Sequence, residues 1–168
     1  MALAIVTVTT QEPPERCPVV SGGGSAINVG RRHFLKRRLK VAISQQPEIK
    51  TLRALLLQMG GAELVAPPWH DCQVPALVRA GFAMDGHVAL KIMRPCACHR
   101  NVSRLWARKR SGLIGIGTGY ALSSDGLWRQ HSWGVGRLGI VETTEARAKY
   151  FGQLFRGADA GLFAACNR

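Results

Sequence analysis

Long apolar runs and acidic side chains are both scarce in this sequence of 168 residues. No apolar run approaches the roughly 18–20 residues that a membrane span requires, so a membrane-spanning protein is excluded. Asp and Glu number 10 against 23 Lys and Arg, which gives a formal net charge of +13. Because 46% of the residues are hydrophobic, the chain is not a disordered polycation. We expect a folded basic protein that attracts anionic partners, a class that includes nucleic acid, phospholipid and acidic protein.

The cysteines lack the pattern of a secreted protein. The chain has 5 of them, an odd number, without the regular spacing of a disulfide framework. This favours a reducing compartment, and we expect a cytoplasmic protein. The sequence RRHFLK at residues 31–36 is similar to the twin-arginine export motif, but the apolar stretch that such a signal needs does not follow it.

Composition changes near residue 45. Residues 1–10 alternate in the manner of a strand, and residues 11–25 are rich in proline and glycine, as flexible connections are. We predict a basic, partly flexible N-terminal extension over residues 1–44 and a single α+β domain over residues 45–168.

Two basic segments support an alternative function, nucleic-acid binding without catalysis. Residues 91–110 contain seven Lys or Arg and no acid. The simplest interpretation of residues 31–40 is a solvated basic arm or helix end, and the alternative is a contact to nucleic acid or a membrane surface. The side chains that would contact nucleic acid in this segment are Arg31, Arg32, Lys36, Arg37, Arg38 and Lys40.

Hydrophobic periodicity predicts the elements of the second domain. Val102, Leu105 and Trp106 have helical spacing, so a helix begins at or near Cys98. Further helices are expected over 47–59, near 73–80 and over 145–151 with Thr144 as its N-cap. Strands are expected over 87–92, 113–122, 127–135 and 138–144.

Cys98 has the setting of a reactive thiol. The unpaired N–H groups and the positive end of the helix dipole stabilise a thiolate at a helix N-terminus, and the nearby Arg94 and Arg100 would lower its pKa further. Cys96 competes for the role of nucleophile. We prefer Cys98 because the amphipathic pattern starts directly after it.

A histidine and a carboxylate are predicted to meet on the neighbouring strands. By the period of two, His131 shares a sheet face with Trp133, and Glu142 shares one with Ile140. Adjacent antiparallel strands can then place His131 beside Glu142. A carboxylate in this position fixes the imidazole tautomer and holds the ring ready to act as a base.

The order of these pieces resembles the catalytic core of the transglutaminase-like branch of the papain-like cysteine enzymes. The likeness covers roughly residues 95–145, and its pieces are Cys98 with its helix, His131-Ser132-Trp133 and Val141-Glu142-Thr143-Thr144. The sequence departs from the family in three ways: His99 follows the cysteine, no glycine directly precedes it, and the acid is Glu where the family usually has Asp.

The resemblance implies a papain-like or transglutaminase-like α+β core, in which a nucleophile helix packs on a small antiparallel sheet. It implies that Cys98 is the nucleophile, His131 the general base and Glu142 the orienting acid. The reaction would be acyl transfer on a protein, a peptide or another amide or ester, with an acidic substrate favoured by the surrounding positive charge. No metal or organic cofactor is required. Hydrolysis and transfer to an amine both stay open.

Three other patterns in the sequence also resemble functional motifs. A zinc site that uses Cys96, Cys98, His99 and His131 lacks the usual C-x₂₋₄-C spacing. The GxGxxG pattern at residues 134–139 leads into a predicted strand, so we expect a hairpin turn there. Asn101 and Gln130 are secondary candidates for oxyanion donors.

Overall fold

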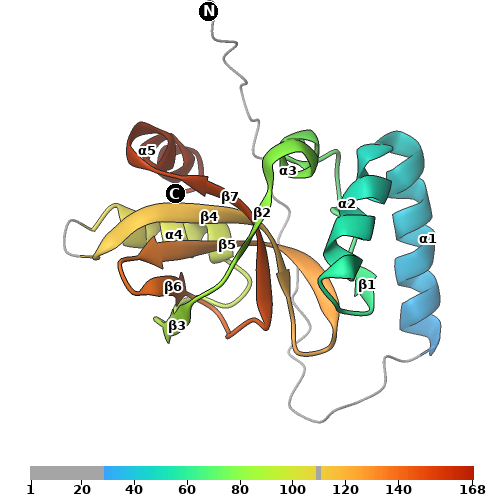
Figure 1. Cartoon of the computed structure of the whole chain (residues 1–168), viewed down its shortest axis with the longest axis horizontal. Helices are drawn as coiled ribbons and strands as arrows, with labels where there is room; N and C mark the ends of the chain where they lie inside the picture. The colour runs from blue at the N-terminus through green and yellow to red at the C-terminus, as the bar shows by residue number, and fades with distance from the viewer. Residues whose placement is uncertain (1–28, 109–110) are drawn as a thin grey trace, which may run out of the picture.

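The computed structural model describes residues 29–108 and 111–168, which form five helices and one seven-stranded sheet (Figure 1). The strand predicted over 1–10 and the flexible connection predicted over 11–25 lie outside these residues. Among the helices of the described ranges, none has the length and apolar character needed to cross a membrane.

The elements follow one another in the order α1 (Val29–Gln45), α2 (Glu48–Gln58), β1 (Glu63–Leu64), α3 (Val74–Ala80), β2 (Phe82–Met84), β3 (His87–Leu90), α4 (Cys98–Trp106), β4 (Leu113–Leu122), β5 (Leu127–Gly136), β6 (Gly139–Glu142), β7 (Lys149–Phe155) and α5 (Gly157–Cys166). The strand order in the sheet is β2-β7-β4-β5-β6-β3, and β1 also pairs with β5. The pairs β1–β5 and β3–β6 are parallel, and the remaining pairs are antiparallel.

The sheet is strongly curled. Strands β2 and β3 lie at its opposite edges, yet only Asp85 and Gly86 separate them in the chain. Because this link spans about 10 Å at most, the two edges must approach each other. The enclosed inner face holds a small core of Met84, Ala121, Trp133, Ile140 and Tyr150.

Two glycines make room for the largest side chain of this inner core. A Cβ atom on Gly117 would lie 2.2 Å from Nε1 of Trp133, and one on Gly152 would lie 2.9 Å from its Cη2. Both distances are well below van der Waals contact, so neither position has space for a side chain while Trp133 keeps its place.

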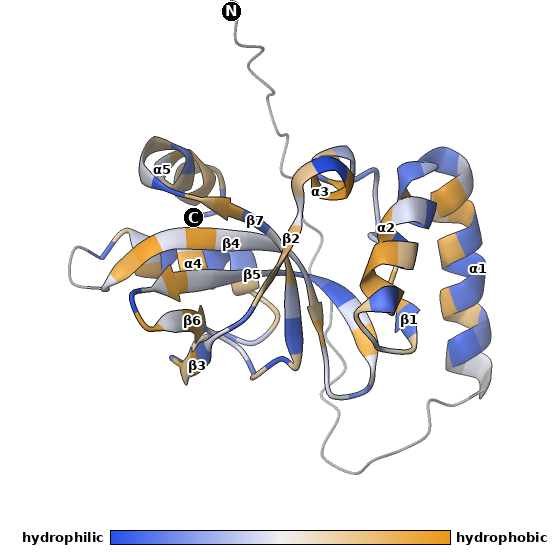
Figure 2. Ribbon diagram, in the orientation of Figure 1, coloured by the Kyte–Doolittle hydropathy of each residue, from blue (hydrophilic) through white to orange (hydrophobic). Residues whose placement is uncertain are grey.

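The helices cover the outer face of the sheet in two groups (Figure 1). Helices α1, α2 and α3 cover the end that carries Tyr120, Leu122 and Trp128. Helices α4 and α5 cover the end that carries Ile116. Helix α1 has hydrophilic and hydrophobic residues along its length (Figure 2), and its Leu39 is buried in the core that it shares with α2. Residues 29–44, predicted to belong to an extension, are therefore part of the folded structure.

The remaining predictions of helices and strands are mostly confirmed. Helices α2, α3 and α4 and strands β3, β4, β5 and β6 lie where periodicity placed them. The helix predicted over 145–151 is wrong, because Lys149–Phe155 is strand β7, paired with β4. Tyr150 packs in the inner core and Phe151 in the outer one, which is the alternation of a strand. The last helix follows as α5.

Candidate active site

Cys98 is the first residue of α4, as predicted. The loop that precedes it is held by Asn101, whose side chain is 1% exposed. Nδ2 of Asn101 donates a hydrogen bond to the carbonyl oxygen of Arg94 at 2.6 Å, and its N–H donates to the carbonyl oxygen of Ala97 at 2.7 Å. Asn101 therefore holds the loop that leads into Cys98. Its side-chain Nδ2 is used in this bond to Arg94 and does not serve as an oxyanion donor.

The thiol of Cys98 lies at a gap along one edge of β5. Strand β1 pairs with β5 at Leu127 and Trp128, and β6 pairs with it from Gly134 to Gly136. Between these two pairings, the backbone N–H of Ser132 helps to lower the pKa of Cys98. The start of α4 thus occupies a place on β5 that no ladder partner takes among the described strands.

His131 is 3% exposed and Cys98 is half-buried, and each of them shifts the pKa of the other through charge and hydrogen bonding. The imidazole stacks on Trp133, with ring centroids 6.2 Å apart and 22° between the planes. Its Nε2 is 2.8 Å from Oε2 of Glu142, so Nδ1 is the nitrogen left for the thiol. The predicted contact between His131 and Glu142 is confirmed.

Glu142 is 0% exposed, and both oxygens of its carboxylate accept hydrogen bonds. Oε2 accepts from His131 and, at 3.2 Å, from the hydroxyl of Tyr150. Oε1 accepts from the N–H of Thr143 at 2.8 Å, the N–H of Thr144 at 3.0 Å and the hydroxyl of Thr144 at 3.1 Å. These bonds compensate for the loss of water, so a buried carboxylate can stay ionised.

Thr144 and Tyr150 bind Glu142, and the sequence did not predict either contact. Thr144 was predicted to cap a helix, but its hydroxyl donates to Glu142. Tyr150 could have been found only by recognising β7 as a strand, since the alternation of Tyr150, Gly152 and Leu154 then directs the tyrosine to the face that carries His131.

The electrostatics favour a charged pair. Burial raises the pKa of Cys98, but the charges of His99 and His131 and the hydrogen bonds from His131 and the Ser132 N–H outweigh it and lower this pKa to about 6. Burial lowers the pKa of His131, but Cys98 and Glu142 outweigh it and raise this pKa to about 9. Between these values the pair is a thiolate and an imidazolium.

The pKa of Glu142 is lowered in spite of burial, because His131 and the backbone N–H groups of Thr144 and Thr143 stabilise the charged form. The main charges acting on Cys98 come from two histidines, His99 and His131, and not from the neighbouring arginines that the sequence suggested.

His99, which follows Cys98, contacts Ser132, which follows His131. Its Nδ1 is 2.6 Å from the hydroxyl oxygen of Ser132. The Ser132 hydroxyl donates to Oγ1 of Thr118 at 2.9 Å, so its oxygen is the acceptor for the ring of His99. The dipeptide Cys98-His99 on α4 thus binds the dipeptide His131-Ser132 on β5.

The other sequence candidates have structural partners. Nε2 of Gln130 is 3.2 Å from Oδ2 of Asp71, which ties this amide away from Cys98. The residues of the GxGxxG pattern form the turn between β5 and β6, as predicted, with Gly136 paired to Gly139. Across residues 29–108 and 111–168, no group of three or more His, Cys, Asp or Glu could hold a metal ion.

No protein-family model, curated protein or solved structure matches this chain.

Proposed function

We propose that the protein is a cysteine-dependent acyl-transfer enzyme with a papain-like or transglutaminase-like core. The observation that carries the proposal is the arrangement in which His131 bonds to the buried Glu142 through Nε2 and stabilises the thiolate of Cys98 by its charge. A nucleophile, a base and an orienting acid in this order are the requirement for covalent acyl catalysis.

The reaction begins with attack of the Cys98 thiolate on the carbonyl carbon of an amide or ester. The negative charge that develops on the carbonyl oxygen is stabilised by N–H groups of the first turn of α4, which have no acceptor within the helix. The imidazolium of His131 then gives its proton to the leaving amine or alcohol as the carbon–heteroatom bond breaks. A thioester on Cys98 and a neutral imidazole remain.

Neutral His131 takes a proton from the second nucleophile, which is water in hydrolysis and an amine in transfer. That nucleophile attacks the thioester carbon, and the sulfur leaves as the thiolate. Glu142 stays ionised throughout and keeps Nε2 of His131 protonated, so Nδ1 is the nitrogen that exchanges the proton.

The test compares thiols within one molecule. Cys98, Cys72 and Cys166 are all free, and the latter two are exposed. At pH near 6.5, iodoacetamide should modify the half-buried Cys98 at least tenfold faster than the two exposed thiols, because thiolate fraction follows pKa. His131→Ala should remove this difference. Peptide mass spectrometry reads the sites separately, and equal rates at all three cysteines in the unsubstituted chain would overturn the proposal.

A further inference from the structure

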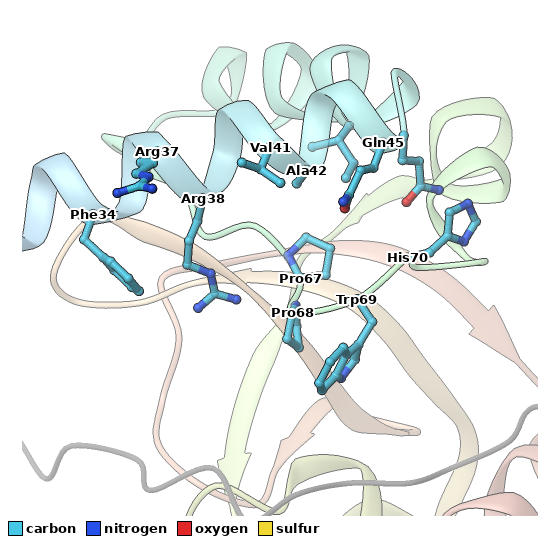
Figure 3. Close-up of a pocket in the computed structure, with 12 residues that line it drawn as sticks. Phe34, Arg37, Arg38, Val41, Ala42, Gln45, Pro67, Pro68, Trp69 and His70 are labelled. Atoms are coloured by element: carbon cyan, nitrogen blue, oxygen red, sulfur yellow. The ribbon is translucent and has the colours of Figure 1, made fainter.

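A second site lies at the other end of the fold. Helix α1 and residues 67–70 border an open groove with a volume of about 250 Å³, lined in part by Phe34, Arg37, Arg38, Trp69 and His70 (Figure 3). The residues around Cys98, His131 and Glu142 do not line it. Its chemistry is therefore separate from the acyl-transfer reaction.

Two aromatic rings in this groove are largely exposed. The exposed fraction is 57% for Phe34 and 65% for Trp69. The guanidinium carbon of Arg38 lies 5.8 Å from the centroid of the Phe34 ring. In Figure 3, Phe34 and Arg38 point from α1 to the side on which Pro68 and Trp69 lie. Rings and a half-buried guanidinium thus share one surface that is open to a ligand.

All charged residues of helix α1, which lies above the groove, are basic. The sequence of α1 contains no acidic residue, and Arg32, Lys36, Arg37 and Lys40 are exposed on it. The charge of Lys36 acts on Glu63, but both oxygens of this carboxylate are bound by Arg53. The positive field of α1 is therefore available to an anionic partner.

We infer that this groove binds single-stranded nucleic acid. Basic side chains along α1 contact the phosphates, and the rings of Phe34 and Trp69 provide stacking surfaces for bases next to them. A basic helix alone would suit any polyanion. The two exposed rings beside Arg38 favour a partner with planar bases over an acidic polypeptide, which has only carboxylates to offer them.

The experiment uses the full chain and a fluorescent oligothymidylate of about 12 nucleotides, a length within the site sizes of such proteins. Anisotropy should report binding whose log affinity falls linearly with log salt concentration. The double variant Arg37→Gln/Arg38→Gln should reduce the magnitude of this slope by about 1.4, at about 0.7 per phosphate contact on a single strand. The double variant Phe34→Ala/Trp69→Ala should weaken binding at least about 30-fold and leave the slope unchanged.

Matched controls lie on the far side of the molecule. Arg137→Gln/Arg156→Gln removes the same charge from two exposed positions, and Leu138→Ala removes an apolar side chain that is 85% exposed. Each control should change affinity less than its groove counterpart. An unchanged circular-dichroism spectrum confirms the fold of every variant, and binding by Cys98→Ala separates this inference from the proposed function.

Four results would overturn the inference, and three of them come from these titrations: no binding of the oligonucleotide at low salt, ring variants that bind as tightly as the unsubstituted chain, or controls that weaken binding as much as the groove variants. The fourth result comes from competition with polyglutamate, which tests whether the groove prefers an acidic polypeptide. If it displaces the oligonucleotide at equal charge concentration, the groove binds acidic protein and the inference is wrong.

Discussion

The imidazole of His131 donates from Nε2 to a carboxylate oxygen of Glu142 at 2.8 Å, and this carboxylate is entirely shielded from solvent. The bond fixes more than the orientation of the ring. It commits Nε2 to carrying a proton, so that all proton exchange with Cys98 takes place at Nδ1. The groups that donate hydrogen bonds to Glu142 stabilise its charged form, so substitution of these groups tests the role of the carboxylate.

Replacement of Glu142 by Gln is expected to reverse the polarity of this bond. Three donors surround Oε1, so the amide oxygen would keep that position and the NH₂ group would face His131. Two donors would then oppose each other, which disfavours the imidazolium. Turnover of an activated ester should fall by about 10²–10⁴-fold, the usual contribution of a positioned acid and base.

Glu145→Gln is the matched control for this loss of charge. Glu145 lies three residues away and its side chain is 65% exposed, so its surface ion pair with Arg147 contributes little. Ester turnover should stay within about twofold of the unsubstituted chain. A Glu142→Gln variant that matched this control would remove Glu142 from the proposed reaction.

Two consecutive threonines offer a finer test of the same carboxylate. Thr144→Val removes a hydroxyl that donates to Oε1 of Glu142 at 3.1 Å. Thr143→Val keeps its backbone N–H bond to Glu142 and removes a buried hydroxyl that has no hydrogen-bond partner.

Only Thr144→Val should raise the pKa of Glu142, since one fewer hydrogen bond stabilises its charged form. Turnover should then be lost on the acid side of the pH–rate profile, by up to about tenfold at a pH below the pKa of Glu142 for a shift of one pKa unit, and should stay nearly unchanged at pH 6. Identical profiles for the two valine variants would show that the Thr144 hydroxyl does not position Glu142.

The pH dependence of the two reactions of Cys98 should differ. Alkylation needs only the thiolate, so its rate should rise through the pKa of about 6 and not fall again at high pH. Acyl transfer also needs the proton on His131, so it should decline as pH passes about 9. Stopped-flow alkylation and ester turnover over the same pH range give both curves. A midpoint for alkylation near the ordinary thiol pKa would contradict the charged pair.

The sequence predicted the local parts of this site and missed the parts that depend on distant pairing. The turn before Leu127 and the alternation on either side of it predict β4 and β5 correctly, and the period of two predicts that His131 meets Glu142. The gap that admits Cys98 depends on where β1 pairs with β5, and Glu63 and Leu64 give no local sign of this. The pairing of β1 with β5 is determined by tertiary contacts and not by local sequence preference.

Strand β7 was missed for a different reason. Thr144 followed by Glu145 has the pattern of a helix start, and that local preference competes with strand formation. The competition is settled by burial, because Tyr150 and Phe151 fill the cores on the two faces of the sheet. The last helix is then displaced to residues beyond Arg156.

His99 is expected to set the reactivity of the thiol without exchanging its proton. Its charge helps to lower the pKa of Cys98, and Ser132 holds its ring. His99→Gln should shift the midpoint of Cys98 alkylation to higher pH, and a shift of one unit slows alkylation about tenfold at pH below the midpoint.

Ser132→Ala is the control for His99, because it keeps the backbone N–H that bonds to Cys98 and removes only the hydroxyl that bonds to His99. Its midpoint should move less than that of His99→Gln. Unchanged midpoints in both variants would assign the low thiol pKa to His131 alone.

The glycine at position 117 should be essential for the packing that supports His131. A Cβ atom there would lie 2.2 Å from Nε1 of Trp133, and Trp133 stacks on the imidazole. Gly117→Ala should lower the free energy of unfolding by about 1–3 kcal/mol, as overpacking does, and slow alkylation of Cys98 by displacing His131.

Gly161→Ala is the matched control, since nothing lies within 4 Å of a Cβ atom at this position in α5. That change should stabilise the protein by up to about 1 kcal/mol, because alanine favours a helix over glycine. Urea denaturation measures both, and equal stability of the two variants would show that the sheet relaxes around Trp133 without cost.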